Sequence, residues 1–212
     1  MSRRIMNRDE ALKIVDELVK SPNIRKHCLA AEAAMRTLAR ELRRKNSELK
    51  IKENFSEEDW GVVGLLHDAD YDALKRDVIA SGKTSDNYEA TILDKHTDLV
   101  TERLKGQVNQ EIIDAIAGHC NKAPRNTLMA KAIYAADELT GLIVAATLVR
   151  PDKKLAGLTA ESVLKRMKEP AFARAVNRED IKTCESELGI ALPEFVEIVL
   201  KAMKGISKDL GL

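Results

Sequence analysis

The sequence is poor in aromatic side chains, which make up 3% of its 212 residues. Proteins that bind single-stranded nucleic acid stack bases on aromatic rings, so this chain is poorly suited to that role. Its charge does not favour such binding either, because 35 basic residues nearly cancel 34 acidic ones and leave a net charge of +1. We therefore expect no binding of long nucleic acid, and any anionic ligand must be held by a local site.

Cysteines and long apolar runs are also scarce. The three cysteines, Cys28, Cys120 and Cys184, are an odd number without paired spacing, which argues for reduced thiols. No stretch approaches 18 uncharged apolar residues, and the N-terminal Met-Ser-Arg-Arg-Ile leads directly into charged residues. We therefore expect neither a membrane span nor a signal peptide, and we predict a cytoplasmic protein. Whether it forms a homo-oligomer stays open.

Apolar residues recur at helical spacing along most of the chain, and strand-like alternation is missing. The sequence therefore predicts an all-α fold. Helices are expected over 8–20, from Pro22 to about 42, from Ser56 to His67, over 92–106, from Asn109, over 127–149, and after Thr159, Asn177 and Pro193. The polar stretch 71–87 reads as a loop with about one helical turn beside the His67-Asp68 pair, and 152–158 reads as a linker. We predict a helical domain over 1–151 and a helical extension over 152–212 that packs on the same domain.

Histidine occurs only four times, and each histidine falls on the apolar side of a separate expected helix: His27, His67, His96 and His119. A single histidine in such a place is more often a hydrogen-bonded core residue than a ligand. Four of them together favour a metal site, although His96 and His119 can also be read as core residues. Asp68 follows His67 directly, and an adjacent imidazole and carboxylate can bind one cation at the end of a helix.

Asp137 is the second unusual residue, because apolar side chains flank it in the expected helix 127–149. A buried carboxylate needs a counter-charge. A salt bridge to a lysine or arginine would supply one, and so would a metal ion. Imidazole and carboxylate groups from several helices form a site suited to manganese, magnesium, iron, cobalt, nickel or zinc.

With these residues in place, the chain resembles the HD-domain superfamily of metal-dependent phosphohydrolases. The pattern of that superfamily is a helical histidine, then His-Asp, then a later aspartate, which His27, His67, Asp68 and Asp137 match within residues 8 to 150. His96 and His119 match the subgroup whose site holds two metals. The resemblance implies an HD-type helical bundle that binds one or two divalent ions through these six residues.

The sequence departs from the familiar His-Asp-Ile-Gly form, because Ala69 and Asp70 follow the His-Asp pair. Tyr71 stands where two-metal relatives often place a lysine that contacts phosphate. The Gly-Tyr-Pro feature of the phosphodiesterases that act on cyclic dinucleotides is absent. These departures argue against that particular substrate and name no other.

The resemblance implies a phosphohydrolase that acts on a small phosphorylated metabolite or nucleotide through metal-activated water. Asp68 is the expected bridging ligand, Asp70 or Asp72 on the following loop would orient or deprotonate the water, and Lys75 and Arg76 would neutralise phosphate. Exposed loop residues such as these four are ordinarily solvated charges. Two other functions stay open: a di-iron oxygenase of the HD type, and a nucleotide-binding module without catalysis.

Overall fold

The computed structural model describes residues 6–46, 53, 55–80 and 88–212. These residues form helices and no strand, which confirms the all-α class. In chain order the helices are α1 (Arg8–Leu18), α2 (Pro22–Asn46), α3 (Glu57–Leu66), α4 (Tyr71–Ala80), α5 (Tyr88–Lys95), α6 (Asp98–Leu104), α7 (Gln110–His119), α8 (Leu128–Leu148), the 3-10 turn η1 (Leu155–Gly157), α9 (Ala160–Met167), α10 (Arg178–Leu188), α11 (Leu192–Gly205) and α12 (Ser207–Leu210).

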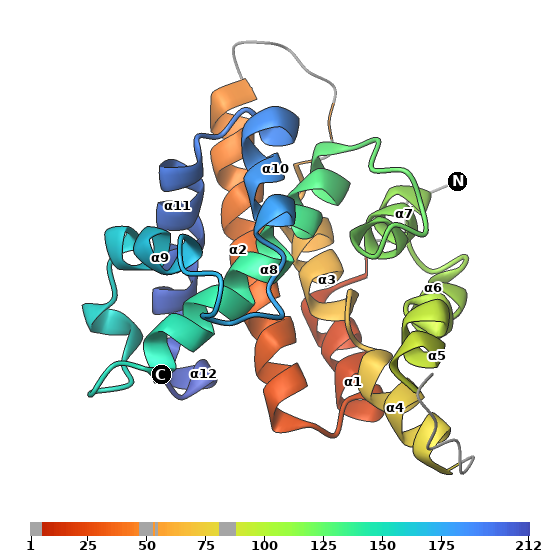
Figure 1. The fold of residues 1–212 in the computed structure, drawn as a ribbon. Helices are drawn as coiled ribbons and strands as arrows, with labels where there is room; N and C mark the ends of the chain where they lie inside the picture. The colour runs from red at the N-terminus through yellow and green to blue at the C-terminus, as the bar shows by residue number, and fades with distance from the viewer. Residues whose placement is uncertain (1–5, 47–52, 54, 81–87) are drawn as a thin grey trace.

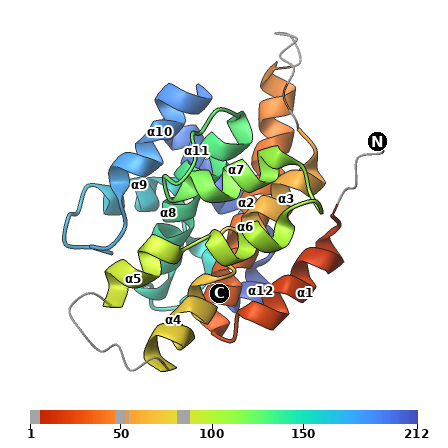
Figure 2. The same cartoon turned by 90° about the vertical axis from the view of Figure 1, so that its right-hand side faces the viewer.

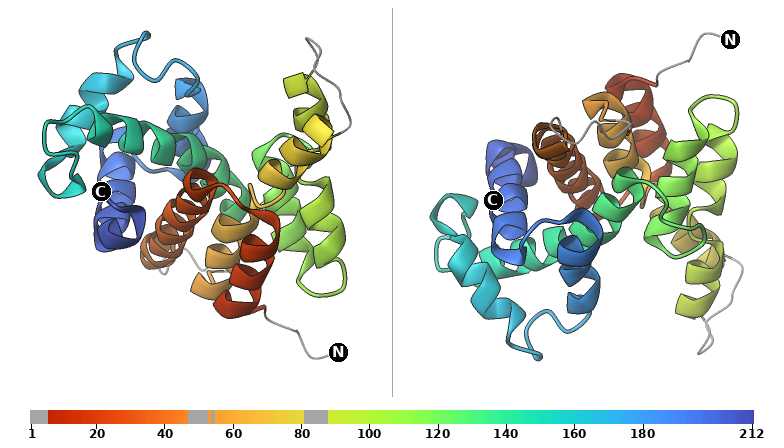
Figure 3. Two further views of the ribbon diagram at one scale, coloured as in Figure 1. Left: turned by 90° about the horizontal axis from the view of Figure 1, so that it is seen from below. Right: turned by 90° about the horizontal axis from the view of Figure 1, so that it is seen from above.

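The two longest helices, α2 and α8, run through the middle of the molecule (Figure 1). Helix α8 is apolar on most of its faces, as a helix surrounded by others must be. Helices α9, α10 and α11 lie on one side of this pair, and α5, α6 and α7 lie on the other, which faces the viewer in Figure 2. Views from below and above show the same division (Figure 3).

One hydrophobic core joins the chain before residue 151 to the chain after it. Leu38 of α2 and Leu139 of α8 belong to the same cluster of buried side chains as Ile181 of α10 and Phe195 of α11. Burial of this apolar surface is the main term that holds the helices together. In the part of the chain that the structure describes, no helix combines the length and the apolar character that crossing a membrane requires.

Three segments differ from the sequence-based expectation. The expected loop 71–87 contains the helix α4, which buries Ala73, Leu74 and Val78 on one side, while 81–87 lies outside the described residues. The expected helix over 92–106 is divided into α5 and α6, because Thr97 adopts a left-handed conformation with φ of 73°. The expected linker 152–158 contains η1, whose Leu155 is fully buried.

Candidate metal centre

Helices α2 and α3 pack very closely beside His27 and His67. A Cβ atom added to Gly64 of α3 would lie 2.6 Å from the backbone oxygen of Ala31 in α2, so a larger residue does not fit there. His27 precedes Ala31 by one turn of α2, and His67 caps the end of α3 one turn after Gly64. The close packing therefore brings the two imidazoles together, and their Nε2 atoms are 3.0 Å apart.

Asp137 of α8 lies beside these two histidines. Its Oδ1 atom is 2.9 Å from Nε2 of His27 and 3.3 Å from Nε2 of His67. Asp68, in the turn after α3, places Oδ2 3.3 Å from the same nitrogen of His27. The side chains of His27, Asp68 and Asp137 are 25%, 22% and 24% exposed. We call the group of His27, His67, Asp137 and Oδ2 of Asp68 the accessible half of the cluster.

The other oxygen of Asp68 faces the two remaining histidines. Its Oδ1 atom is 3.0 Å from Nε2 of His96 and 3.4 Å from Nε2 of His119, and these two nitrogens are 3.1 Å apart. The side chains of His96 and His119 are each only 5% exposed. We call His96, His119 and Oδ1 of Asp68 the enclosed half. The two halves thus share one carboxylate, and each offers a group of atoms close enough to hold a metal ion.

Two of the histidines have their tautomer set by backbone carbonyl groups. Nδ1 of His67 is 2.9 Å from the carbonyl oxygen of Gly64, and Nδ1 of His119 is 2.5 Å from that of Ile116. A carbonyl oxygen can only accept a hydrogen bond, so in each ring Nδ1 carries the hydrogen and donates it. In the neutral imidazole, Nε2 is then left with a free lone pair, which points into the cluster.

Side chains orient the other two histidines in the same way. Nδ1 of His96 is 2.9 Å from Oδ1 of Asp70. Nδ1 of His27 is 3.3 Å from Oγ1 of Thr140, whose hydroxyl hydrogen is donated to the backbone oxygen of Asp137. Both partners accept a hydrogen bond from Nδ1, so Nε2 is again directed inward. Ligand histidines in metalloproteins are held by outer partners of this kind.

This arrangement fits a bound cation. Four Nε2 atoms face one another in pairs at 3.0 and 3.1 Å, and such lone pairs repel unless a proton or a cation lies between them. Among the described residues, the ion pairs of Asp137 are with His27 and His67 rather than with a lysine or arginine. Imidazole and carboxylate ligands without a thiolate suit divalent ions such as manganese, iron, cobalt or zinc.

The charges of the cluster depend strongly on one another. Burial by itself would lower the pKa of His96, but hydrogen bonds to Asp68 and Asp70 outweigh it and raise that pKa to about 10. Burial likewise opposes the rise in the pKa of His27, which Asp137 and Asp68 hold well above its ordinary value. The surrounding histidines keep the pKa of Asp68 well below its usual range despite its burial. The carboxylates therefore stay anionic and attract positive charge, whether protons or a metal ion.

Asp70 has a different position from the one expected from the sequence. Instead of an exposed loop carboxylate beside the water, it is fully buried. Besides the bond to His96, its Oδ1 atom accepts the backbone N–H of Thr97 at 3.1 Å, and its Oδ2 atom accepts that of Val100 at 3.3 Å. Asp70 therefore holds the junction between α5 and α6 in place and aims His96 at the cluster. We assign it a positioning role.

Asp72 and Arg76 also have structural partners. Oδ2 of Asp72 accepts the backbone N–H groups of Lys20 and Ser21 at 2.6 and 2.9 Å, in the turn between α1 and α2. Arg76 donates to Asp72 and to the backbone oxygen of Leu18. The expected exposed loop is thus a helix, α4, that is tied to the start of α2. Lys75 is exposed on the same helix, and its contact with phosphate stays a prediction.

Tyr71, at the position where two-metal relatives often have a lysine, packs against the enclosed half. Its ring meets that of His96 edge-on, with 5.6 Å between the ring centroids. Burial raises the pKa of its hydroxyl. At this position the chain therefore has a neutral ring that covers His96, instead of a positively charged side chain that could bind phosphate.

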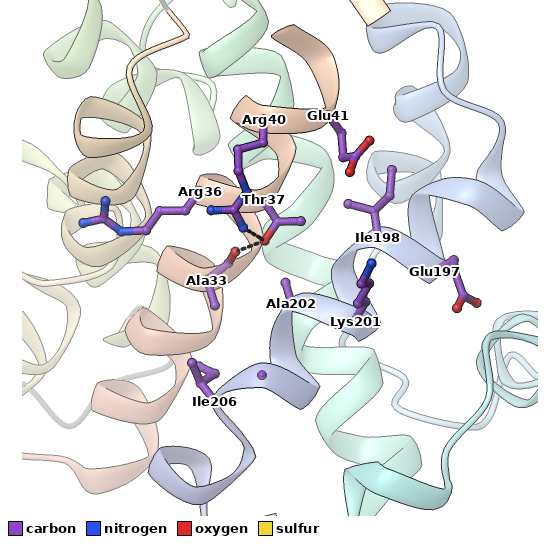
Figure 4. Close-up of a pocket in the computed structure, with 11 residues that line it drawn as sticks. Ala33, Arg36, Thr37, Arg40, Glu41, Glu197, Ile198, Lys201, Ala202 and Ile206 are labelled. Atoms are coloured by element: carbon purple, nitrogen blue, oxygen red, sulfur yellow. Dashed lines mark hydrogen bonds between the residues drawn. The ribbon is translucent and has the colours of Figure 1, made fainter. Parts of the chain in front are cut away.

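A hollow between α2 and α11 lies away from the cluster. It has a volume of about 550 Å³ between α2 and α11 and is lined by none of the six ligand candidates. Figure 4 shows Thr37 and Arg40 on one wall and Ile198 and Lys201 on the other. Its arginines are engaged, since Arg36 pairs with Glu32 and Glu58 and Arg40 pairs with Glu57. The residues that line this hollow include no histidine and no aspartate, the two residue types that make up the cluster.

Fold and cluster together define an all-helical protein whose central helices hold a His/Asp group suited to divalent metal. The family model of the HD domain matches residues 24–142, which is more than half of the chain and includes all six ligand candidates. The chain therefore belongs to the HD domain family, whose members are generally metal-dependent hydrolases. Comparisons with curated proteins and with solved structures gave no match.

Proposed function

We propose that the chain is a metal-dependent phosphohydrolase that acts on a small phosphorylated metabolite or nucleotide. The observation that carries the proposal is the inward convergence of four Nε2 atoms on Asp68 and Asp137, each imidazole being held from behind through Nδ1. A divalent cation at such a site supplies Lewis-acid chemistry: it makes hydroxide available near neutral pH and stabilises negative charge on a phosphoryl oxygen.

The two halves of the cluster would have different roles. His27 and Asp137 are about one quarter exposed, so a phosphate group would approach from the accessible half. The enclosed half would hold its ion away from solvent, with Asp70 fixing His96 and the backbone of Ile116 fixing His119. Asp68 would link the halves, because each of its oxygens faces one of them.

The class of substrate follows from charge and composition. The balance of 35 basic and 34 acidic residues gives no extended positive field for a polyanion. With 3% aromatic residues, the chain also has little surface for stacking a series of bases. Both properties support a single phosphoryl group on a small molecule as the ligand.

The test is a phosphate-release assay on protein loaded with manganese, cobalt, iron or zinc, using mononucleotides and small phosphate monoesters. We expect release that a chelator abolishes and that Asp137→Asn strongly reduces. Asp152→Asn is the matched control, because Asp152 is exposed and pairs with Arg150 away from the cluster.

Three outcomes would contradict the proposal or a part of it. Oxygen consumption by the iron-loaded protein without phosphate release would show an oxygenase. Binding of a nucleotide that stays unchanged after long incubation with the metal-loaded protein would show a binding module. Steep, salt-dependent binding of long nucleic acid, tighter than that of mononucleotides, would contradict the predicted class of substrate.

A further inference from the structure

A smaller hollow opens directly beside the accessible half. It has a volume of about 350 Å³ and lies between the start of α2, the second half of α8 and the segment that contains α12. His27 forms part of its wall, and the apolar side chains of Val144, Leu148, Leu210 and Leu212 form most of the rest. We call it the His27 pocket. Its volume is in the range of pockets that hold small ligands.

The wall supplied by α8 continues the helix face that carries Asp137. Gly141, Val144 and Leu148 follow Asp137 at intervals of four, three and four residues, which places them on one side of the helix. A molecule whose phosphate lies at Asp137 would therefore have its remaining part beside Gly141 and then beside the two apolar side chains. Leu148 is 49% exposed, so the apolar wall continues to the surface.

Gly141 has no packing reason to be glycine. Within a helix, glycine is less stable than alanine, because its backbone loses more conformational freedom on folding. A Cβ atom at Gly141 would meet no heavy atom within 4 Å, whereas one at Gly64 would meet the backbone of α2. The missing side chain at Gly141 instead enlarges the His27 pocket one helical turn from Asp137.

Polar groups lie at the rim of this pocket. Asn23 and Lys26 are both exposed on α2 and line the pocket next to His27. A charged group on a bound molecule can therefore lie near Lys26 and the metal ligands, while its apolar part enters between α8 and the leucines. The lining of the pocket therefore suits a molecule with one anionic end and one apolar end.

We propose that the His27 pocket binds the apolar group of the substrate, which is thus a phosphate monoester of an apolar alcohol. This inference rests on the proposed phosphohydrolase function for its chemistry, but the pocket can be tested by binding alone. Each buried methylene group contributes about 0.8 kcal/mol, which corresponds to about fourfold in affinity or in kcat/KM.

The experiment uses two series of probes on the metal-loaded protein. Alkyl phosphates from methyl to hexyl report kcat/KM, and the matching alkylphosphonates, which lack the ester bond, report affinity by calorimetry. In the unaltered protein both quantities should rise about fourfold per methylene until the pocket is filled. In Gly141→Leu the rise should be lost, because the new side chain occupies the pocket.

Gly205→Leu is the matched control. Gly205 ends α11, a Cβ atom there also meets nothing within 4 Å, and it lines the hollow between α2 and α11. The dependence on chain length should be unchanged in this variant. Leu148→Ser replaces a half-exposed side chain and provides a second test should Gly141→Leu fail to fold. It should weaken the dependence on chain length without filling the pocket.

The outcomes separate this inference from the proposed function. Alkylphosphonate affinities that do not change with chain length, or that rise equally in Gly141→Leu, would overturn the pocket assignment. Affinities that rise with chain length and lose that rise in Gly141→Leu support the assignment even where no alkyl phosphate is hydrolysed. In that case the phosphohydrolase proposal alone would fail.

Discussion

The two halves of the cluster share Asp68 but are built differently. The accessible half takes its ligands from α2, α3 and α8, which cross in the centre of the molecule. The enclosed half takes His96 from a junction between two short helices and His119 from the last residue of α7. His27 and Asp137 are about one quarter exposed, whereas His96 and His119 are 5% exposed.

Under the proposed function, this difference separates the part of the site that would meet substrate from the part that would support it. An exposed edge beside an apolar pocket can admit a small molecule, and the accessible half has both. The enclosed half is covered by Tyr71 and held by Asp70, so under the proposed function it would fix an ion and hold Asp68. The comparison can be tested by changing one half at a time.

The largest effect is expected in the accessible half. Asp137→Asn keeps the shape of the side chain and removes its charge, so phosphate release should fall by about 10³-fold, the equivalent of several kcal/mol of transition-state stabilisation. Initial rates at saturating metal measure the effect, with circular dichroism as a check of folding. A rate within tenfold of that of the unaltered protein would contradict the role of this half.

A paired test of the outer partners separates the halves. Asp70→Asn removes the acceptor charge behind His96, and Thr140→Val removes the acceptor behind His27. Each variant should lower the affinity for one metal ion by about 10–100-fold and leave the affinity for the other nearly unchanged. Metal titration by calorimetry measures both affinities. If either variant lowers the affinity for both ions equally, the two halves do not act as separate sites.

The close packing behind the accessible half predicts an effect on stability. Gly64→Ala places a Cβ atom against the backbone of Ala31, so the free energy of unfolding should fall by about 1–3 kcal/mol. Gly141→Ala makes no such contact and should raise it by about 0.5–1 kcal/mol. Urea unfolding of the metal-free proteins gives both values. Equal changes of the same sign would refute the packing argument.

Protons and metal should compete in the enclosed half. The pKa of His96 in the folded, metal-free protein is about 10, above that of the unfolded chain. The stabilisation that its proton provides is therefore complete below about pH 6.5 and is lost as the pH rises through about 10. At pH 8, metal binding should release about one proton from this residue, and metal affinity should increase with pH over this interval. Zinc titration in buffers of different ionisation enthalpy measures the proton count, and buffer-independent heats would contradict it.

Several helices could be predicted because their ends carry strong local signals. Asn7 and Glu10 form the capping box of α1, and Ser56 caps α3 as its sequence indicates. Gly189 ends α10 in the left-handed conformation, and Pro193 lies in the first turn of α11. Such signals depend only on neighbouring residues, so the sequence alone reveals them.

The enclosed half was harder to predict because its geometry depends on contacts between distant residues. Leu93, Leu99 and Val100 fit one helical pattern, which does not reveal that Thr97 breaks it. The break is stabilised by Asp70, 27 residues earlier in the chain. The apolar spacing of Ala73, Leu74 and Val78 was the available signal for α4, but the surrounding polar residues obscured it. All six ligand candidates were identified from the sequence, whereas the positioning role of Asp70 required the structure.

The central claim is that Asp68 joins two ion sites, and metal content tests this claim most directly. Elemental analysis should find about two divalent ions per chain in the unaltered protein, about one when His96 and His119 are both changed to Gln, and almost none in Asp68→Ala. Metal-free protein should also melt at a lower temperature than loaded protein, because only the folded state binds the ions. Full metal content in the double variant would show that these histidines are packing residues, and full content in Asp68→Ala would contradict the shared site itself.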